Sequence, residues 1–402
     1  MIKIAVLGYG VVGSGVVHVL DKNSDRISRN AGQEIQVKYI LDIRDFNDSL
    51  YKHLFAKDFE TIINDPEIAV VVEVIGGVDA ALTFTRRCLE AGKNVVTSNK
   101  ELVAEYGSEL LKLAFDKGVN YLFEASVGGG IPVIRPLAQC MTANTISEIY
   151  GILNGTTNYI LTDMERNGAD FSDALSEAQQ KGYAESDPTA DIEGFDTCRK
   201  ICILSSLAFG RHIYPRQVPT EGISGVTLND MKFAAELGYE IKLLGRARAV
   251  GDKVSVYVAP HLISHSNLLA VVDDVMNGVV VRGNAVGNVV FCGAGAGKLP
   301  TASAVVADVI DAVKHLHARR WISWTDGCED LVMNPEQLES AWYIRTDATR
   351  ELVGKVFGNV VFAGDTGSET IFITNVISGK IVEDLLGRGI TANSRFRVLG
   401  DH

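Results

Sequence analysis

A glycine-rich turn between a short strand and a helix most constrains how this chain can fold. Residues 2–7 are apolar and predict a strand, the sequence then reads Gly-Tyr-Gly-Val-Val-Gly, and a helical pattern covers residues 14–20. The three glycines allow a tight turn, a close approach of phosphate to the backbone, and packing of helix on strand. Free amides at the helix start bind anions. The turn therefore predicts a Rossmann domain for a dinucleotide. Its predicted contacts are Gly8, Gly10, Val11, Val12 and Gly13.

The second predicted strand, residues 36–41, ends at Asp42, and Arg44 follows two positions later. An acidic residue at this strand end binds the adenosine ribose hydroxyls of NAD, whereas an arginine nearby accommodates the 2′-phosphate of NADP. Because both residue types are present, the sequence predicts a nicotinamide dinucleotide and leaves the choice between NAD(H) and NADP(H) open.

Two further strand–helix units continue the predicted parallel sheet. The apolar residues 69–77 predict a buried strand before helix 79–91, and residues 95–100 predict the end of a strand before helix 101–117. Ligands of such sheets bind outside the carboxyl ends of the strands. Lys100 therefore either contacts cofactor or substrate there or is an ordinary surface lysine.

Residues 181–200 form an acidic stretch that leads into a helix. Five carboxylates lie between Glu185 and Asp196 with no basic residue among them, and apolar spacing predicts a helix over residues 192–208. On that helix Asp196 and Lys200 share one face. A carboxylate and an ammonium at one place suit a small polar substrate that carries a positive charge and exchanges a proton. The alternative is a solvated acidic loop with an ordinary ion pair.

A possible oxygen-ligand site precedes this stretch. Residues 121–132 predict a strand that ends in Glu124 and a glycine-rich turn. Such a turn can aim one carboxylate and several carbonyl oxygens at a single point, which suits a hard cation.

The rest of the chain predicts two more parts. A second sheet is predicted from strands at 145–153, 253–260, 279–283 and 288–292, and a glycine-rich turn at 293–297 either contacts the cofactor or closes the sheet. After Pro335 the order βαββαβ is typical of a small ferredoxin-like module. The predicted class is α/β, with an N-terminal Rossmann doubly wound parallel sheet, a second α+β substrate and dimerisation domain, and the βαββαβ module. The predicted boundaries are 1–131, 132–320 and 338–402.

Composition and charge narrow the partners. The 402 residues are 47% hydrophobic and 22% charged, as expected of a globular protein. A net charge of -12 makes nucleic acid and anionic membranes poor partners. The N-terminus enters a strand without a signal-peptide pattern, and no apolar run is long enough to span a membrane. With six scattered cysteines, the expectation is a cytoplasmic protein with reduced thiols.

Several motifs together resemble the homoserine dehydrogenase family over residues 1 to 320. They are the Gly8 turn, Val96-Thr-Ser-Asn-Lys100, Glu124-Ala-Ser-Val-Gly-Gly-Gly-Ile-Pro132, Asn154-Gly-Thr-Thr-Asn158, G-Y-x-E-x-D-P-x-x-D-x-x-G-x-D-x-x-x-K at 182–200, and Gly295-Ala-Gly297 before Pro300. The motif at 182–200 is the most specific. The resemblance implies reversible NAD(P)H-dependent reduction of L-aspartate 4-semialdehyde to L-homoserine, in threonine, methionine and isoleucine biosynthesis.

The resemblance also implies roles for individual residues. They are Lys200 as proton donor, Glu185 and Asp196 as substrate ligands, Asp191 as a supporting acid, Lys100 at the junction of cofactor and substrate, Gly297 as a late cofactor contact, and Glu124, Val127, Gly129 and Ile131 as a sodium site. In the implied reaction hydride reaches C4 of the aldehyde, and the alkoxide takes a proton from Lys200. Asp196 would orient that ammonium and keep it charged.

The family resemblance further implies a homodimer or a higher homo-oligomer. The βαββαβ module resembles ACT domains, which bind amino-acid effectors, but Arg350-Glu-Leu-Val353 replaces their usual Gly-Val-Leu. Two alternatives remain open. Another amino-acid dehydrogenase on the same fold would need the Gly8 turn but not both Glu185 and the Asp196–Lys200 pair. A regulatory protein that senses dinucleotide and amino acid would bind cofactor without turnover.

Overall fold

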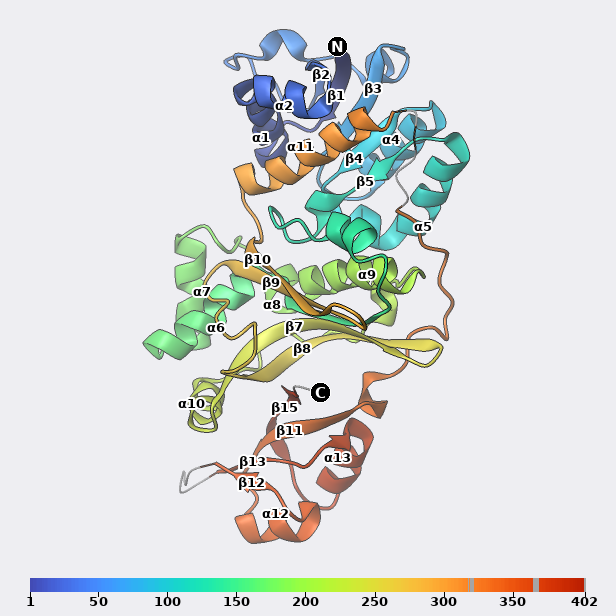
Figure 1. The fold of residues 1–402 in the computed structure, drawn as a ribbon. Helices are drawn as coiled ribbons and strands as arrows, with labels where there is room; N and C mark the ends of the chain where they lie inside the picture. The colour runs from blue at the N-terminus through green and yellow to red at the C-terminus, as the bar shows by residue number, and fades with distance from the viewer. Residues whose placement is uncertain (317, 319–321, 364–368, 401–402) are drawn as a thin grey trace. The chain divides into compact units, whose positions relative to one another are not determined.

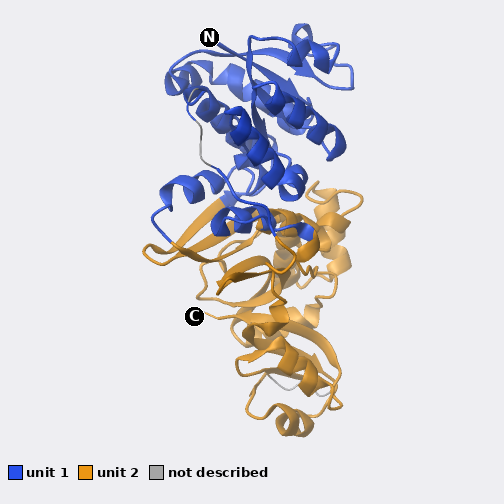
Figure 2. Ribbon diagram, turned by 90° about the vertical axis from the view of Figure 1, so that its right-hand side faces the viewer, with its two compact units in different colours: residues 1–144, 202–215, 293–327 blue, residues 145–201, 216–292, 328–402 orange. Residues whose placement is uncertain are grey.

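Figure 1 shows the computed structural model, which describes residues 1–316, 318, 322–363 and 369–400. The chain divides into two compact units, which Figure 2 distinguishes by colour. Unit 1 comprises residues 1–144, 202–215 and 293–327, and unit 2 comprises residues 145–201, 216–292 and 328–402. No described helix is both long enough and apolar enough to span a membrane.

Unit 1 contains a five-stranded parallel sheet in the order β2-β1-β3-β4-β5. Its strands are β1 (Ile2–Leu7), β2 (Ile35–Leu41), β3 (Ile68–Glu73), β4 (Asn94–Thr97) and β5 (Tyr121–Leu122). Its helices are α1 (Val11–Lys22), α2 (Ser24–Ala31), α3 (Phe59–Ile63), α4 (Asp79–Glu90), α5 (Lys100–Lys117) and α11 (Lys298–Lys314). This confirms the predicted Rossmann sheet; α2 and α3 were not predicted.

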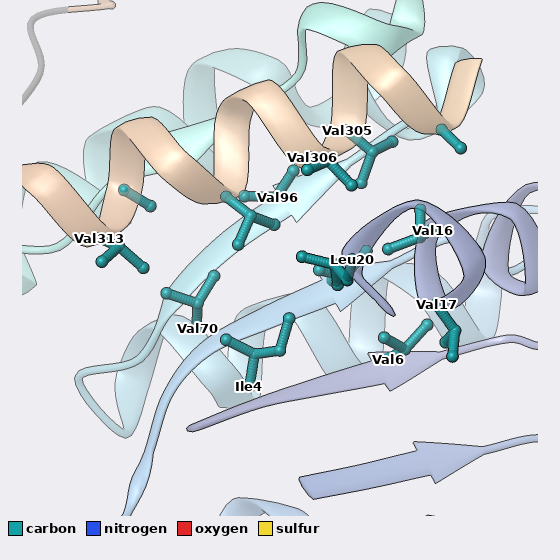
Figure 3. Packing of buried hydrophobic residues seen from close by; sticks show 14 of the residues in the cluster. Ile4, Val6, Val16, Val17, Leu20, Val70, Val96, Val305, Val306 and Val313 are labelled. Carbon is teal, nitrogen blue, oxygen red and sulfur yellow. The ribbon is translucent and has the colours of Figure 1, made fainter. Parts of the chain in front are cut away.

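Helix α11 belongs to the core of unit 1, although it lies far from α1 in the sequence. Figure 3 shows Val305 and Val306 of α11 in the same apolar cluster as Val16 and Leu20 of α1. The two helices approach so closely at Gly15 that an added Cβ would lie 2.8 Å from the carbonyl oxygen of Lys298. The predicted domain boundaries stay predictions.

Unit 2 is built on a ten-stranded sheet in the order β10-β9-β6-β7-β8-β15-β11-β13-β12, with β14 paired to β11. Its strands are β6 (Ile146–Ile152), β7 (Tyr239–Val250), β8 (Lys253–Ser264), β9 (Met276–Gly283), β10 (Gly287–Ala294), β11 (Glu339–Thr346), β12 (Val361–Phe362), β13 (Thr370–Ile373), β14 (Ile377–Ser378) and β15 (Ala392–Leu399). Its helices are α6 (Gly155–Asn167), α7 (Phe171–Gln180), α8 (Thr189–Ile192), α9 (Phe195–Phe209), whose second half is assigned to unit 1, α10 (Leu228–Glu236), α12 (Arg350–Phe357) and α13 (Gly379–Leu386).

In the C-terminal module β11, α12, β12, β13, α13 and β15 follow one another in the predicted βαββαβ order, and the short strand β14 is an unpredicted addition before α13. Its sheet is not separate from the rest of unit 2, because residues 397–399 of β15 pair in parallel with residues 261–263 of β8. A buried ion pair adds a second link, with Arg345 Nε of β11 lying 2.8 Å from Asp230 Oδ1 of α10. Tyr343 and Ser394 also donate hydrogen bonds to the Asp230 carboxylate. The module is thus fixed to the larger sheet by strand pairing and by buried charge.

Candidate active site

The predicted pair on the α9 helix is present and buried. Lys200 Nζ donates to Asp196 Oδ2 at 2.6 Å and to the carbonyl oxygen of Leu153 at 2.7 Å. The side chains of Lys200 and Asp196 are only 10% and 3% exposed. A solvated acidic loop would leave such a pair in water, so the surface alternative does not describe this site. Burying two charges is costly unless other hydrogen bonds satisfy them, which points to a functional reason for the pair.

Asn154 connects this pair to the acidic stretch. Its Oδ1 accepts from the backbone N–H of Thr157 and so caps α6, while its Nδ2 donates to Asp191 Oδ1 at 2.7 Å and to Asp196 Oδ2 at 2.8 Å. In the sequence Asn154 stands out only as the first residue of the Asn154–Asn158 motif. The hydrogen bonds of its Nδ2 join residues far apart in the sequence and so appear only in the folded chain. Asn154 therefore gathers Asp191 and Asp196 beside Lys200.

A glycine sets the turn that leads from α8 to α9. Gly194 has φ +80°, a left-handed conformation that other residues rarely adopt, and it lies between Asp191 and Asp196. The adjoining loop is held by the bond from Ile223 N–H to the carbonyl oxygen of Ile192 at 2.8 Å. This turn lets one short segment deliver two carboxylates to the same amide.

Glu185 makes no described bond to this cluster. Its residue is exposed, and its backbone oxygen accepts from Gln179 Nε2 at 3.1 Å. In the described part of the chain no hydrogen bond or ion pair joins its carboxylate to Asp191, Asp196 or Lys200. A role for Glu185 in substrate binding stays a prediction.

Unit 1 contains a cavity of about 940 Å³ at the carboxyl ends of its strands, and its lining includes Gly8, Gly10, Asp42 and Arg44. The glycines are required there, since a Cβ on Gly13 would lie 1.9 Å from the carbonyl oxygen of Gly8. Gly10 is the N-cap of α1, and because it has no side chain the first amides of the helix have no side-chain cap. The turn thus fits a dinucleotide pyrophosphate, with the amides of Val11 and Val12 in the first turn of the helix.

Arg44 compensates the charge of Asp42 within this cavity. Arg44 Nε and Nη2 donate to the two Asp42 oxygens at 3.0 Å each, and Tyr9 N–H donates to Oδ2 at 2.7 Å. The hydrogen bonds from Arg44 lower the pKa of Asp42 to about 2. Both carboxylate oxygens are therefore already engaged, which the sequence could not reveal.

Lys100 and Gly297 occupy helix starts in unit 1. Lys100 is the first residue of α5, which Asn99 caps, and Gly297 is the N-cap of α11 with φ +126°. Neither is among the described residues that line the cavity. Their roles at the cofactor stay predictions.

The Glu124 carboxylate is held by backbone amides. Oε1 accepts from Val133 and Ile134 at 2.7 and 2.8 Å, and Oε2 accepts from Arg135 at 2.8 Å. Burial and the neighbouring Glu124 raise the pKa of Asp308 to about 7.

Three carbonyl oxygens of the predicted cation site accept no hydrogen bond within the described residues. They belong to the buried residues Val127, Gly129 and Ile131.

Comparisons with known proteins agree with the resemblance drawn from the motifs. Residues 132–310 match the homoserine dehydrogenase family, and residues 8–124 match its NAD-binding domain. Homoserine dehydrogenase from Neisseria gonorrhoeae is 46% identical over 363 residues, which cover 87% of this chain and 82% of that protein. The Bacillus subtilis enzyme is 40% identical over 319 residues, covering 78% and 73%.

Solved structures agree as well. The crystal structure of a homoserine dehydrogenase from Thiobacillus denitrificans has a TM-score of 0.90 and 37% identity, and covers 99% of this chain and 98% of its own. A hyperthermophilic archaeal homoserine dehydrogenase in complex with NADPH has a TM-score of 0.65 and 27% identity, covering 77% and 97%. Both family matches and the 46% identity over 87% of the chain show that the chain belongs to the homoserine dehydrogenase family.

Proposed function

We propose that this chain catalyses the reversible NAD(P)H-dependent reduction of L-aspartate 4-semialdehyde to L-homoserine, a step toward threonine, methionine and isoleucine. The observation that carries this proposal is the buried Asp196–Lys200 pair, which Asn154 joins to Asp191. A dehydrogenase for another amino acid has no need of this whole arrangement, and a sensing protein has no need of a buried acid.

The residues of the site divide the work of the reaction. When bound, the nicotinamide cofactor supplies or accepts the hydride. Lys200 gives a proton to the carbonyl oxygen during reduction and takes it back during oxidation. Asp196 and the carbonyl oxygen of Leu153 fix the direction of the Lys200 ammonium. Asp191, with Glu185 from the exposed part of the stretch, supplies negative charge for the substrate ammonium.

The preferred cofactor is NADP(H). Asp42 is already neutralised by Arg44, so it offers little attraction to ribose hydroxyls. The cavity lining also includes Lys52 and Lys57, against a single further carboxylate, Asp45. This excess of positive charge suits the 2′-phosphate of NADP.

The cation site proposed at Glu124, Val127, Gly129 and Ile131 binds sodium through oxygen atoms. Support comes from the three buried carbonyls that accept no hydrogen bond within the described residues and from the Glu124 carboxylate beside them in the sequence. Oxygen donors of this kind suit a hard cation. No described group of three or more His, Cys, Asp or Glu residues could hold a metal, so this site would rely mainly on backbone oxygens.

An amino-acid effector is proposed for the C-terminal module. A cavity of about 630 Å³ is lined by Arg395 of β15, Glu383 of α13, and Glu193 and Glu221 of the preceding segments. An amino acid carries a carboxylate and an ammonium, which Arg395 and the glutamates complement.

The cytoplasmic location and the homo-oligomeric state expected from the sequence stay predictions.

The central test is oxidation of L-homoserine by the purified protein, followed by nicotinamide absorbance. Lys200→Ala is expected to lower kcat by ~10²–10⁴ with little change in KM, because it removes proton transfer in the transition state. Lys112→Ala is the matched control, since that exposed lysine pairs with Asp116 on α5 and belongs to none of the site segments. Wild-type turnover in Lys200→Ala would remove Lys200 from the chemistry.

Cofactor choice is tested by Arg44→Ala. Losing a charge-assisted contact to the 2′-phosphate is expected to lower kcat/KM with NADP about 10-fold to 100-fold and to leave NAD less affected. Arg86→Ala, which breaks a surface pair with Glu109, serves as the control. Equal losses with both cofactors would contradict the proposed role of Arg44.

Sodium binding is tested by thermal unfolding at constant ionic strength, with sodium chloride exchanged for choline chloride. Sodium is expected to raise the Tm, because a ligand at 100 times its Kd stabilises the native state by about 2.7 kcal/mol. Identical melting in the two salts would argue against the site.

The effector cavity is tested by melting curves with each L-amino acid in turn. At least one is expected to raise the Tm of the wild type and to lose this effect in Arg395→Ala, because the mutation removes the partner of the ligand carboxylate. Arg388→Ala, an exposed arginine outside the cavity lining, should retain the shift. A wild type that responds to none of the amino acids would rule out this proposal.

A further inference from the structure

Glu73 is a fully buried carboxylate at the carboxyl end of β3, in the middle strand of the Rossmann sheet. Its Oε1 accepts the backbone N–H of Ile75 at 2.7 Å, and its Oε2 accepts the hydroxyl of Thr97 at 2.6 Å. The mechanism proposed above makes no use of this residue. Because removing a carboxylate from water is energetically costly, the burial of Glu73 calls for an explanation.

Asn99 closes these bonds into a ring. Its N–H donates to Thr97 Oγ1 at 2.9 Å, and its Nδ2 donates to the carbonyl oxygens of Gly77 at 2.6 Å and Ile75 at 3.3 Å. Glu73 therefore holds the loop of residues 74–77 by accepting the N–H of Ile75. Asn99 holds the same loop by donating to the carbonyl oxygens of Ile75 and Gly77. Asn99 also caps α5, which begins at Lys100.

The same loop borders the cofactor cavity. Val74, Ile75 and Gly76 line it, and a Cβ on Gly8 would lie 2.6 Å from the carbonyl oxygen of Val74. A shift of the loop would thus move the floor of the cavity against the glycine-rich turn. We propose that Glu73 is a positioning residue for the dinucleotide, which fixes residues 74–77 through Ile75 and Thr97. This inference rests on the cofactor site proposed above.

The ring makes cofactor binding depend on pH. Burial raises the pKa of Glu73 to about 7. The titratable groups that interact with its charge, Cys88 of α4 and Tyr121 of β5, stay neutral at that pH because burial raises their own pKa values. The ionised Glu73 carboxylate accepts hydrogen bonds from both Ile75 and Thr97. The protonated acid must instead donate to Thr97. The Thr97 hydroxyl then loses its acceptor, and Ile75 is left with a neutral acceptor. The loop is therefore held best above neutral pH.

The test is fluorescence titration of NADPH into the full chain from pH 6 to pH 8.5. In the wild type the Kd is expected to fall about tenfold as the pH rises through 7, the effect of one charge-assisted hydrogen bond. Glu73→Gln imitates the protonated acid and is expected to keep the weaker Kd at every pH. Glu67→Gln, an exposed glutamate at the other end of the sheet paired with Lys3 and Lys38, should retain the wild-type profile. Titration of the ligand itself affects wild type and variants alike, so the difference between their profiles reports on Glu73.

A second variant covers the case in which Glu73→Gln folds poorly. The bond from Thr97 lowers the pKa of Glu73, so Thr97→Val is expected to move the midpoint of the pH profile upward. A purely structural role would weaken binding without moving that midpoint. A Glu73→Gln profile that matches the wild type would overturn the inference. Absence of homoserine turnover beside an intact pH step in NADPH binding would instead reject only the proposed reaction.

Discussion

The buried ion pair between Asp196 and Lys200 is the interaction on which the site depends. Two charges removed from water stay ionised only when hydrogen bonds replace their hydration. Here the carbonyl oxygen of Leu153, at the end of β6, and the amide of Asn154, at the start of α6, provide those bonds. The pair therefore fixes the positions of a strand end, a helix start and α9 at once. The Asn154 amide that stabilises the pair by donating to Asp196 also donates to Asp191 and so places Asp191 beside the pair.

Unit 1 follows a different constraint, the close approach of backbone to backbone. Gly8, Gly13 and Gly15 lie where a Cβ would meet a carbonyl oxygen at 2.6, 1.9 and 2.8 Å. These contacts let the turn, α1 and α11 pack on the sheet while leaving the first amides of α1 without a side-chain cap. Phosphate binding and dense packing thus have the same origin in the sequence.

Much of this could be predicted from local patterns. The Gly8 turn, the parallel sheet, the shared face of Asp196 and Lys200 and the βαββαβ order each depend on residues near one another in the chain. Strand β7 was missed because Gly245 and its charged neighbours interrupt the apolar pattern, although Gly245 is needed where Ile201, Leu153 and Thr197 pack. The packing of α11 on α1, the second bonds of Asn154 and the neutralisation of Asp42 depend on tertiary contacts, so no local pattern contains them.

The C-terminal module is connected to the acidic stretch by a short path within unit 2. The cavity beside the C-terminal module is lined in part by Glu193 and Glu221. Glu221 N–H donates to the carbonyl oxygen of Val258 in β8, and Ile223 N–H donates to that of Ile192. β15, which carries Arg395, pairs with β8 as well. A ligand that shifts this loop would therefore act on the segment that carries Asp191 and Asp196. Because coupling between two binding equilibria is reciprocal, substrate would change the affinity for that ligand by the same factor. A module attached only by a flexible linker would have no such connection.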